Sequence, residues 1–138
     1  MAQVRDIMEK NVITIPLEKT ALDAARILKE KKISFLVIVQ EDKPLGIVTE
    51  RDIVRKIAAE DKNASSTKLE EIMSVNFKWV EPSTTVDAAV QKMVNSNIRR
   101  LVVLENEKLV GVITQTDLAG FLRSKLLING TVESLDKN

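Results

Sequence analysis

Hydrophobic and polar positions follow one another along the chain in blocks whose periods predict strand, helix and strand in turn. Residues 12–15 form a short β-rich run that stops at Pro16. From Thr20 to about Lys32 apolar residues recur at helical spacing, behind a hydroxyl cap that is followed three residues later by an acid. The continuous apolar run 35–39 then predicts a strand.

A hairpin and a second helix complete the block. Residues 40–44 are a polar turn, and the apolar run 45–48 is the predicted return strand. The second helix is predicted to start after Thr49 and to continue through Ile57. The predicted order is therefore β-α-β-β-α, with a right-handed crossover at the strand–helix–strand step if those two strands are parallel.

The whole block occurs twice. Residues 4–57 fall on residues 69–122 without a gap, at a constant offset of 65 positions. The second copy predicts a first strand at residues 77–80 and a helix that starts at Thr84 or Thr85. A hairpin of residues 101–104 with 109–113 follows, and the last helix ends at about Asn129-Gly130. A duplicated unit predicts a body with a pseudo-twofold axis, in which a site built by one copy can also be built by the other.

These patterns define a domain organisation and a fold class. Residues 1–60 are the first repeat, 61–67 a polar linker, 68–128 the second repeat and 129–138 a polar tail. Each repeat predicts a small mixed sheet with helices on one face, so the chain is placed in the α+β class. One repeat of about 54 residues would be marginally stable alone, so the two copies are expected to share apolar surface.

Composition removes several classes of function. Lys and Arg total 21 against 20 Asp and Glu, and aromatic residues make up 3% of the chain. A net charge of +1 without a basic stripe argues against nucleic-acid and membrane partners. The run 35–39 is the longest apolar stretch, far below the ~20 residues of a membrane span, and the N-terminus carries no apolar signal segment. We therefore expect a cytoplasmic protein.

The chain has neither cysteine nor histidine. Disulfides, thiolate chemistry and cysteine-ligated zinc are excluded, and the commonest general base and metal ligand is missing. We therefore expect no enzyme, no metal site and no resident cofactor.

One phrase carries candidate chemistry. Gly46-Ile47-Val48-Thr49-Glu50-Arg51-Asp52 recurs as Gly111-Val112-Ile113-Thr114-Gln115-Thr116-Asp117, and is called here the Gly-Thr-Asp phrase. Glycine permits a close approach to the backbone, and Thr and Asp at a helix N-terminus suit a ribose with its phosphate. The same Thr-x-x-Asp spacing is also a capping box, which stabilises by about 1 kcal/mol without any ligand. Residue types alone leave both interpretations open.

Together with this phrase, two further pieces recur in both repeats and carry a resemblance to a known family. They are Ile7-Met8 with Ile72-Met73, and the run 33–38 with Ile98-Arg99-Arg100-Leu101. In this order, the pieces resemble the tandem CBS domain, the cystathionine-β-synthase-type regulatory or Bateman module, here as a stand-alone pair. The resemblance covers nearly the whole chain.

The resemblance implies two clefts between the repeats that bind AMP, ADP, ATP, S-adenosylmethionine or NAD. In the family the Asp of the phrase takes the ribose hydroxyls and the Thr contacts ribose or phosphate, which implies Asp52 with Thr49 and Asp117 with Thr114. Gly46 and Gly111 belong to the same phrase. The base pocket is implied for Val12, Ile13, Thr14, Ser34 and Phe35 in one cleft, and for Phe77, Lys78, Trp79, Arg99 and Arg100 in the other.

The two implied clefts differ in sequence. Trp79 stands where the first repeat has Thr14, and it either stacks on an adenine, fills the cleft, or packs in the core. Arg100 replaces Phe35 and suits a phosphate, as do Arg51 and Lys78, although all of these cations can also be solvated. Many relatives carry proline where this chain has Val37 and Val102. These differences predict two sites of unequal affinity or ligand.

Two functions remain. The first is a regulatory module that binds an adenosine-containing ligand and signals by a shift in conformation to a protein partner or through its own homodimer. The alternative is a structural homodimerisation module without a ligand. It would use the apolar faces of the second helices, at Ile53, Val54, Ile57, Leu118, Phe121 and Leu122.

Overall fold

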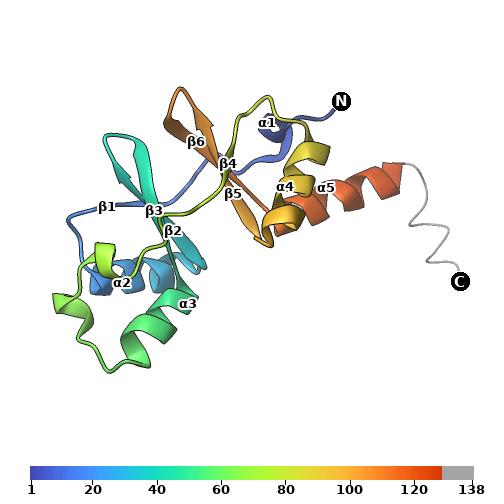
Figure 1. Cartoon of the computed structure of the whole chain (residues 1–138). Coiled ribbons are helices and arrows are strands. Elements are labelled where there is room, and N and C mark those ends of the chain that lie inside the picture. The colour runs from blue at the N-terminus through green and yellow to red at the C-terminus, as the bar shows by residue number, and fades with distance from the viewer. Residues whose placement is uncertain (129–138) are drawn as a thin grey trace, which may run out of the picture. The chain divides into compact units, whose positions relative to one another are not determined.

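A computed structural model describes residues 1–128 of the 138-residue chain, so the predicted tail and the helix end at Asn129-Gly130 lie outside the described residues. The chain forms two three-stranded sheets with flanking helices (Figure 1). The strands are β1 Thr14–Pro16, β2 Phe35–Gln40, β3 Lys43–Thr49, β4 Trp79–Val80, β5 Arg100–Glu105 and β6 Lys108–Thr114. The helices are α1 Val4–Ile7, α2 Ala21–Lys31, α3 Glu50–Asp52, α4 Val86–Ser96 and α5 Gln115–Ile128, with short turns η2 Ala64–Ser66 and η3 Leu69–Glu71.

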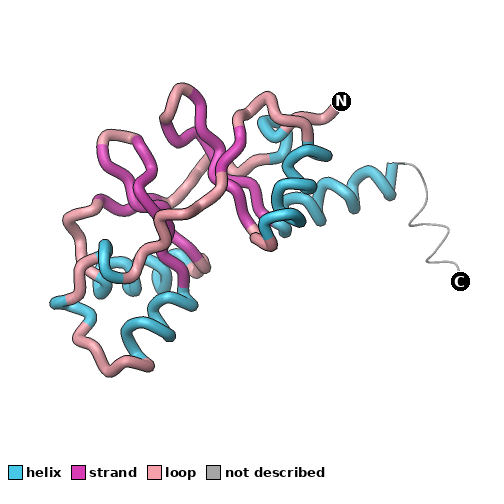
Figure 2. Tube along the Cα trace, viewed as in Figure 1, coloured by secondary structure: helices cyan, strands magenta, loops and turns pink. Residues whose placement is uncertain are grey.

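Both sheets have the same topology, which confirms the α+β class and the β-α-β-β-α order (Figure 2). The first strand is parallel to the second, with Thr14 opposite Val37 in one sheet and Trp79 opposite Val102 in the other. The second strand of the first sheet then pairs antiparallel with β3. Both first strands begin two residues later than predicted, β1 at Thr14 rather than at residue 12 and β4 at Trp79 rather than at residue 77.

The two hairpins bury the same positions residue by residue. In β2 and β5 the second to fourth residues are buried, and in β3 and β6 the fourth to sixth. Leu36, Ile38 and Val48 pack with α2 in one cluster, while Val37 on the opposite face of its strand is also fully buried. Burial on both faces explains why the central strands are continuous apolar runs.

The helix starts follow capping chemistry. Thr20 caps α2, and hydrogen bonds from its backbone N–H and its hydroxyl lower the pKa of the Asp23 carboxyl. Thr85 caps α4 by accepting from the Ala88 N–H, so the helix starts after Thr85 rather than Thr84. The second helix of the first repeat was predicted as an ordinary helix, yet after Asp52 it continues as a six-residue π-helix, η1 Ile53–Ala58.

Compact units in space differ from the repeats in the sequence. One unit contains Met1–Lys10, Lys78–Glu105 and the described residues from Val110 onward, and the other contains Asn11–Phe77 and Asn106–Leu109. The segment ahead of each first strand therefore packs with the other repeat. The Val4 N–H donates to Thr84 O at 2.8 Å and the Val86 N–H to Ala2 O at 3.0 Å.

The same exchange occurs in the other unit. The Ala21 N–H donates to Thr67 O at 2.9 Å, and Ser74 pairs with Ile47 through two backbone hydrogen bonds of 2.9 and 3.0 Å. Each leading segment also supplies a fully buried side chain to its unit, Val4 in the first and Leu69 in the second. Within residues 1–128, no helix is both long and apolar enough to cross a bilayer.

Candidate functional site

Both Gly-Thr-Asp phrases end a strand and begin a helix, and both form the capping box in full. Asp52 Oδ2 accepts hydrogen bonds from Thr49 N at 2.9 Å and Thr49 Oγ1 at 3.1 Å, and Asp52 N donates to Thr49 Oγ1 at 3.1 Å. The corresponding distances for Asp117 and Thr114 are 2.9, 3.0 and 3.2 Å. The capping interpretation is thus confirmed, and it occupies only the Oδ2 atom of each carboxylate.

The remaining carboxylate oxygens differ between the two phrases. Asp52 Oδ1 lies 3.1 Å from Lys56 Nζ, and the Asp52 side chain is only 13% exposed. Lys56 Nζ also donates to Ile72 O at 2.9 Å. Asp117 Oδ1 has no hydrogen bond or ion pair within the described residues, because Phe121 stands where the first repeat has Lys56.

The start of the second strand lies beside each phrase. The Glu50 N–H donates to Ser34 O at 2.9 Å, and Phe35 is in register with Thr49. In the second repeat the Gln115 N–H donates to Arg99 O at 3.0 Å. The side chains of Ser34 and Arg99 are exposed, as is that of Arg51, which lies between Thr49 and Asp52 in the first phrase. Phe35 and Arg100 are partly buried.

The first strand of each sheet is separated from the phrase by the central strand. Val37 N donates to Ile13 O at 3.3 Å, and Val102 N donates to Lys78 O at 3.1 Å. Thr14 and Lys78 are exposed, whereas Ile13 packs against the core cluster of its unit. The structure therefore places these residues on the same sheet as the phrase, two strands away from it.

Trp79 is exposed, so the interpretation of this residue as a core side chain is wrong. It leaves 45% of its surface accessible at the edge of its sheet. Lys92 Nζ donates to Trp79 O at 2.6 Å and lies 5.8 Å from the centre of the indole ring. The Lys92 ammonium thus lies over the indole ring, whose exposed part is a flat apolar surface.

Each glycine of the two phrases is contacted by the segment ahead of the other repeat's first strand, which we call the exchanged segment. A Cβ on Gly111 would lie 2.7 Å from Met8 Sδ and 3.0 Å from Glu9 O, and one on Gly46 would lie 2.9 Å from Met73 Sδ and 3.0 Å from Ser74 O. The predicted close approach to the glycine backbone is therefore made by the protein itself. The recurring Ile-Met pair ahead of each first strand was the sequence signal for it.

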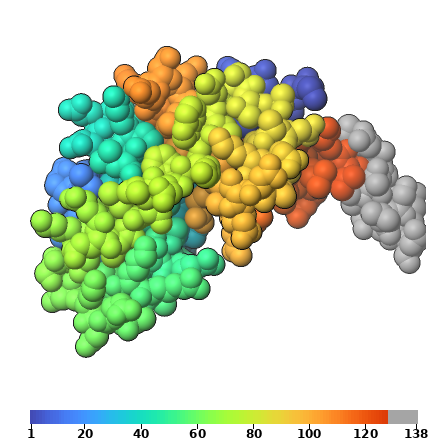
Figure 3. Space-filling model, viewed as in Figure 1, coloured from blue at the N-terminus to red at the C-terminus, as the bar shows by residue number. Residues whose placement is uncertain are grey.

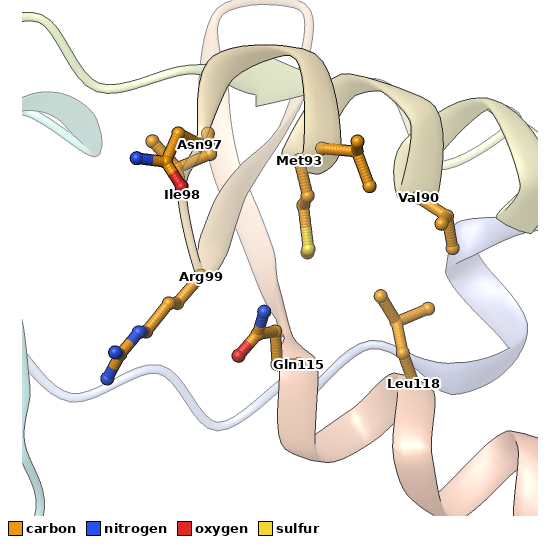
Figure 4. Close-up of a pocket in the computed structure, with 8 residues that line it drawn as sticks. Val90, Met93, Asn97, Ile98, Arg99, Gln115 and Leu118 are labelled. Carbon is orange, nitrogen blue, oxygen red and sulfur yellow. The ribbon is translucent and has the colours of Figure 1, made fainter.

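A pocket that the sequence did not predict lies on the unit that contains the second repeat (Figure 4). It has a volume of about 460 Å³ and is lined by Val90, Met93, Val94, Asn97, Ile98, Arg99, Gln115 and Leu118. Met93, Val90 and Leu118 face the space from α4 and α5, while the Arg99 guanidinium extends away from it. Of the lining residues, Arg99 alone was among the predicted site residues.

Comparison with known proteins decides the family. The CBS domain matches residues 4–59 and again residues 69–124. The chain belongs to the CBS domain family. This CBS pair is 39% identical over 117 residues to an uncharacterized protein of Methanopyrus kandleri, covering 83% of this chain and 60% of that longer protein.

Two solved structures are similar to this CBS pair over most of its length. The CBS domain pair of protein MJ0100, in complex with 5′-methylthioadenosine and S-adenosyl-L-methionine, is 31% identical with a TM-score of 0.80, covering 91% of this chain and 98% of that one. A hexameric CBS-CP12 protein from bloom-forming cyanobacteria is 34% identical with a TM-score of 0.75, covering 85% and 66%.

Proposed function

We propose that this CBS pair is a regulatory module that binds an adenosine-containing ligand through its Gly-Thr-Asp phrases and transmits binding by a change of conformation. One observation carries the proposal: Asp117 is fixed through Oδ2 while its Oδ1 has no partner within residues 1–128. A held carboxylate with an open oxygen is an acceptor for the hydroxyls of a ribose. Both ligands of the similar MJ0100 pair contain adenosine.

The threonine of each phrase has a restricted role in this proposal. Thr114 Oγ1 gives its proton to Asp117 Oδ2 and accepts from Asp117 N, so it can only accept one further hydrogen bond. An ionised phosphate offers no proton, whereas a ribose hydroxyl does. We therefore assign Thr114 and Thr49 to the ribose, and Arg99, Arg100, Arg51 and Lys78 to the phosphate or another acidic group.

The base is assigned to the first strands. In the second repeat the exposed indole of Trp79 supplies a flat apolar surface for an adenine. In the first repeat Ile13, Thr14 and Phe35 take this part, with Ser34 beside the phrase. Under this assignment the two sites differ in chemistry.

A thermal-shift panel with AMP, ADP, ATP, S-adenosylmethionine and NAD tests the proposal. A ligand at 100 times its Kd should add about 2.7 kcal/mol to the free energy of unfolding. Asp117→Ala should abolish the shift contributed by the second repeat and, through loss of the cap, should itself lower stability by about 1 kcal/mol. Asp52→Ala should do the same for the first repeat.

Asp23→Ala is the matched control, because Asp23 forms the same capping box with Thr20 outside either phrase. This variant should lose a cap and keep the full ligand shift. If no ligand stabilises the wild type and all three variants melt lower alike, the aspartates are caps only.

Homodimerisation is a second candidate function, supported by the α4/α5 face, defined as Val90, Val94, Leu122 and Leu127. These side chains are 39%, 68%, 57% and 54% exposed, and both helices reach the surface in the view of Figure 3. In the first repeat Lys29 stands at the position of Val94, and Ile57 at the position of Leu122 is buried. A helix with apolar residues on several sides normally packs against a partner.

We expect the wild-type chain to be a dimer in size-exclusion chromatography with light scattering. The double variant Val94→Lys/Leu122→Lys should be a monomer, because it places two unpaired charges in the contact. Val75→Lys, at a position 60% exposed outside the faces named for dimerisation, should remain a dimer. A monomeric wild type at high concentration would exclude this function.

A further inference from the structure

The two phrases differ most in what occupies the free oxygen of the aspartate. Lys56, four residues after Asp52, holds Oδ1 at 3.1 Å, and the equivalent residue of the second repeat is Phe121. The backbone and threonine contacts of the two phrases agree within about 0.1 Å. The capping contacts of the two carboxylates therefore match, and the lysine is the difference at the remaining oxygen, within a following helix that is η1 in the first repeat and α5 in the second.

Lys56 is held more firmly than an ordinary surface lysine. Its ammonium bridges two fixed acceptors, Asp52 Oδ1 and the carbonyl oxygen of Ile72 at 2.9 Å. Ile72 is fully buried, and the Lys56 side chain is 42% exposed. A lysine with two partners gives up its contact with Asp52 less readily than one with a single solvent-exposed partner.

From this difference we infer that Lys56 competes with ligand hydroxyls for Asp52 and makes the first-repeat site the weaker of the two. The inference rests on the proposed binding of a ribose by the phrases. A diol that approaches Asp52 must displace the ammonium or share Oδ1 with it, whereas at Asp117 both lone pairs of Oδ1 are available. The second-repeat site consequently fills first.

Isothermal titration with AMP and, separately, with S-adenosylmethionine tests the inference. The wild type should show a tighter and a weaker site, with Asp117→Ala removing the tighter and Asp52→Ala the weaker. Lys56→Met should tighten the weaker site by about tenfold, the equivalent of one competing charge-assisted hydrogen bond removed. The reciprocal change Phe121→Lys should weaken the Asp117 site, since residues four apart on a helix are within reach of each other.

Two controls separate this effect from others. Lys62→Met removes another positive charge of the same unit, one that makes no hydrogen bond or ion pair with the phrase, and it should leave both affinities unchanged. Binding at Asp117 in the Lys56→Met protein reports that the variant is folded.

The outcomes are distinct. If either probe binds at Asp117 and Lys56→Met leaves the Asp52 site unchanged or weaker, Lys56 is not a competitor, although the proposed function stands. If neither probe binds the wild type or any variant, both the proposed function and this inference are wrong.

Discussion

Replacing Leu69 with alanine should lower the free energy of unfolding by about 3 kcal/mol, the range found for a buried leucine that leaves a cavity. Leu69 is fully buried and packs in the cluster of Leu36, Ile38 and Val48. By sequence it belongs to the second CBS domain, which begins at residue 69, but its contacts are with the first sheet. The loss of stability should therefore appear in the first repeat.

Denaturant unfolding gives the size of the effect, and hydrogen exchange gives its place. In Leu69→Ala, amides of β2 and β3 should exchange faster, with a smaller change in β5 and β6. Val4→Ala is the mirror control, because Val4 is fully buried in the cluster of Leu101, Val103 and Ile113. Its faster exchange should lie in β5 and β6. Faster exchange in β5 and β6 for Leu69→Ala, and in β2 and β3 for Val4→Ala, would show that the leading segments do not pack with the other repeat.

Replacing Gly111 with valine should have a comparable effect, a loss of about 3 kcal/mol at the upper end of the usual cost of overpacking. Its Cβ alone would lie 2.7 Å from Met8 Sδ and 3.0 Å from Glu9 O, and two methyl groups would add to the conflict. The Met8 thioether can move aside, but the Glu9 carbonyl oxygen is held by a hydrogen bond of 3.0 Å from the Val112 N–H. The backbone contact therefore sets the cost.

Gly120→Val is the matched control for this substitution. A Cβ at Gly120 would meet nothing within 4 Å, so the free energy of unfolding should stay within about 0.5 kcal/mol of the wild type. Adding Met8→Ala to Gly111→Val should recover part of the loss in a double-mutant cycle. Equal costs at the two glycines would show that Gly111 is not tightly packed.

Local signals predicted most of the fold. The apolar run 35–39 and its copy predicted the central strands because both faces are buried, and Thr20 with Asp23 predicted the start of α2 because the cap satisfies free N–H groups. The recurrence of the same β-α-β-β-α order in the second copy followed from the repeat. The π-helix at Ile53–Ala58 had no sequence signal, since its counterpart in the second repeat is an ordinary helix.

The site was predicted less completely. The phrase identified both capping boxes, but the partner of Asp52 Oδ1 depends on how Lys56 reaches Ile72, a contact 16 residues apart. The exposure of Trp79 depends on its edge position, which a two-residue strand does not reveal. The pocket beside α4 needed the packing of two helices that no local pattern specifies.

The exchanged leading segments also bear on how such a protein could arise. A chain with one copy of the block would present a leading segment whose packing surface lies on another copy, as Val4 and Leu69 show here. Two single-copy chains would have to trade these segments to complete their cores, which is a domain-swapped dimer. Gene duplication with fusion turns that bimolecular trade into an intramolecular one, so that the folded state no longer depends on protein concentration.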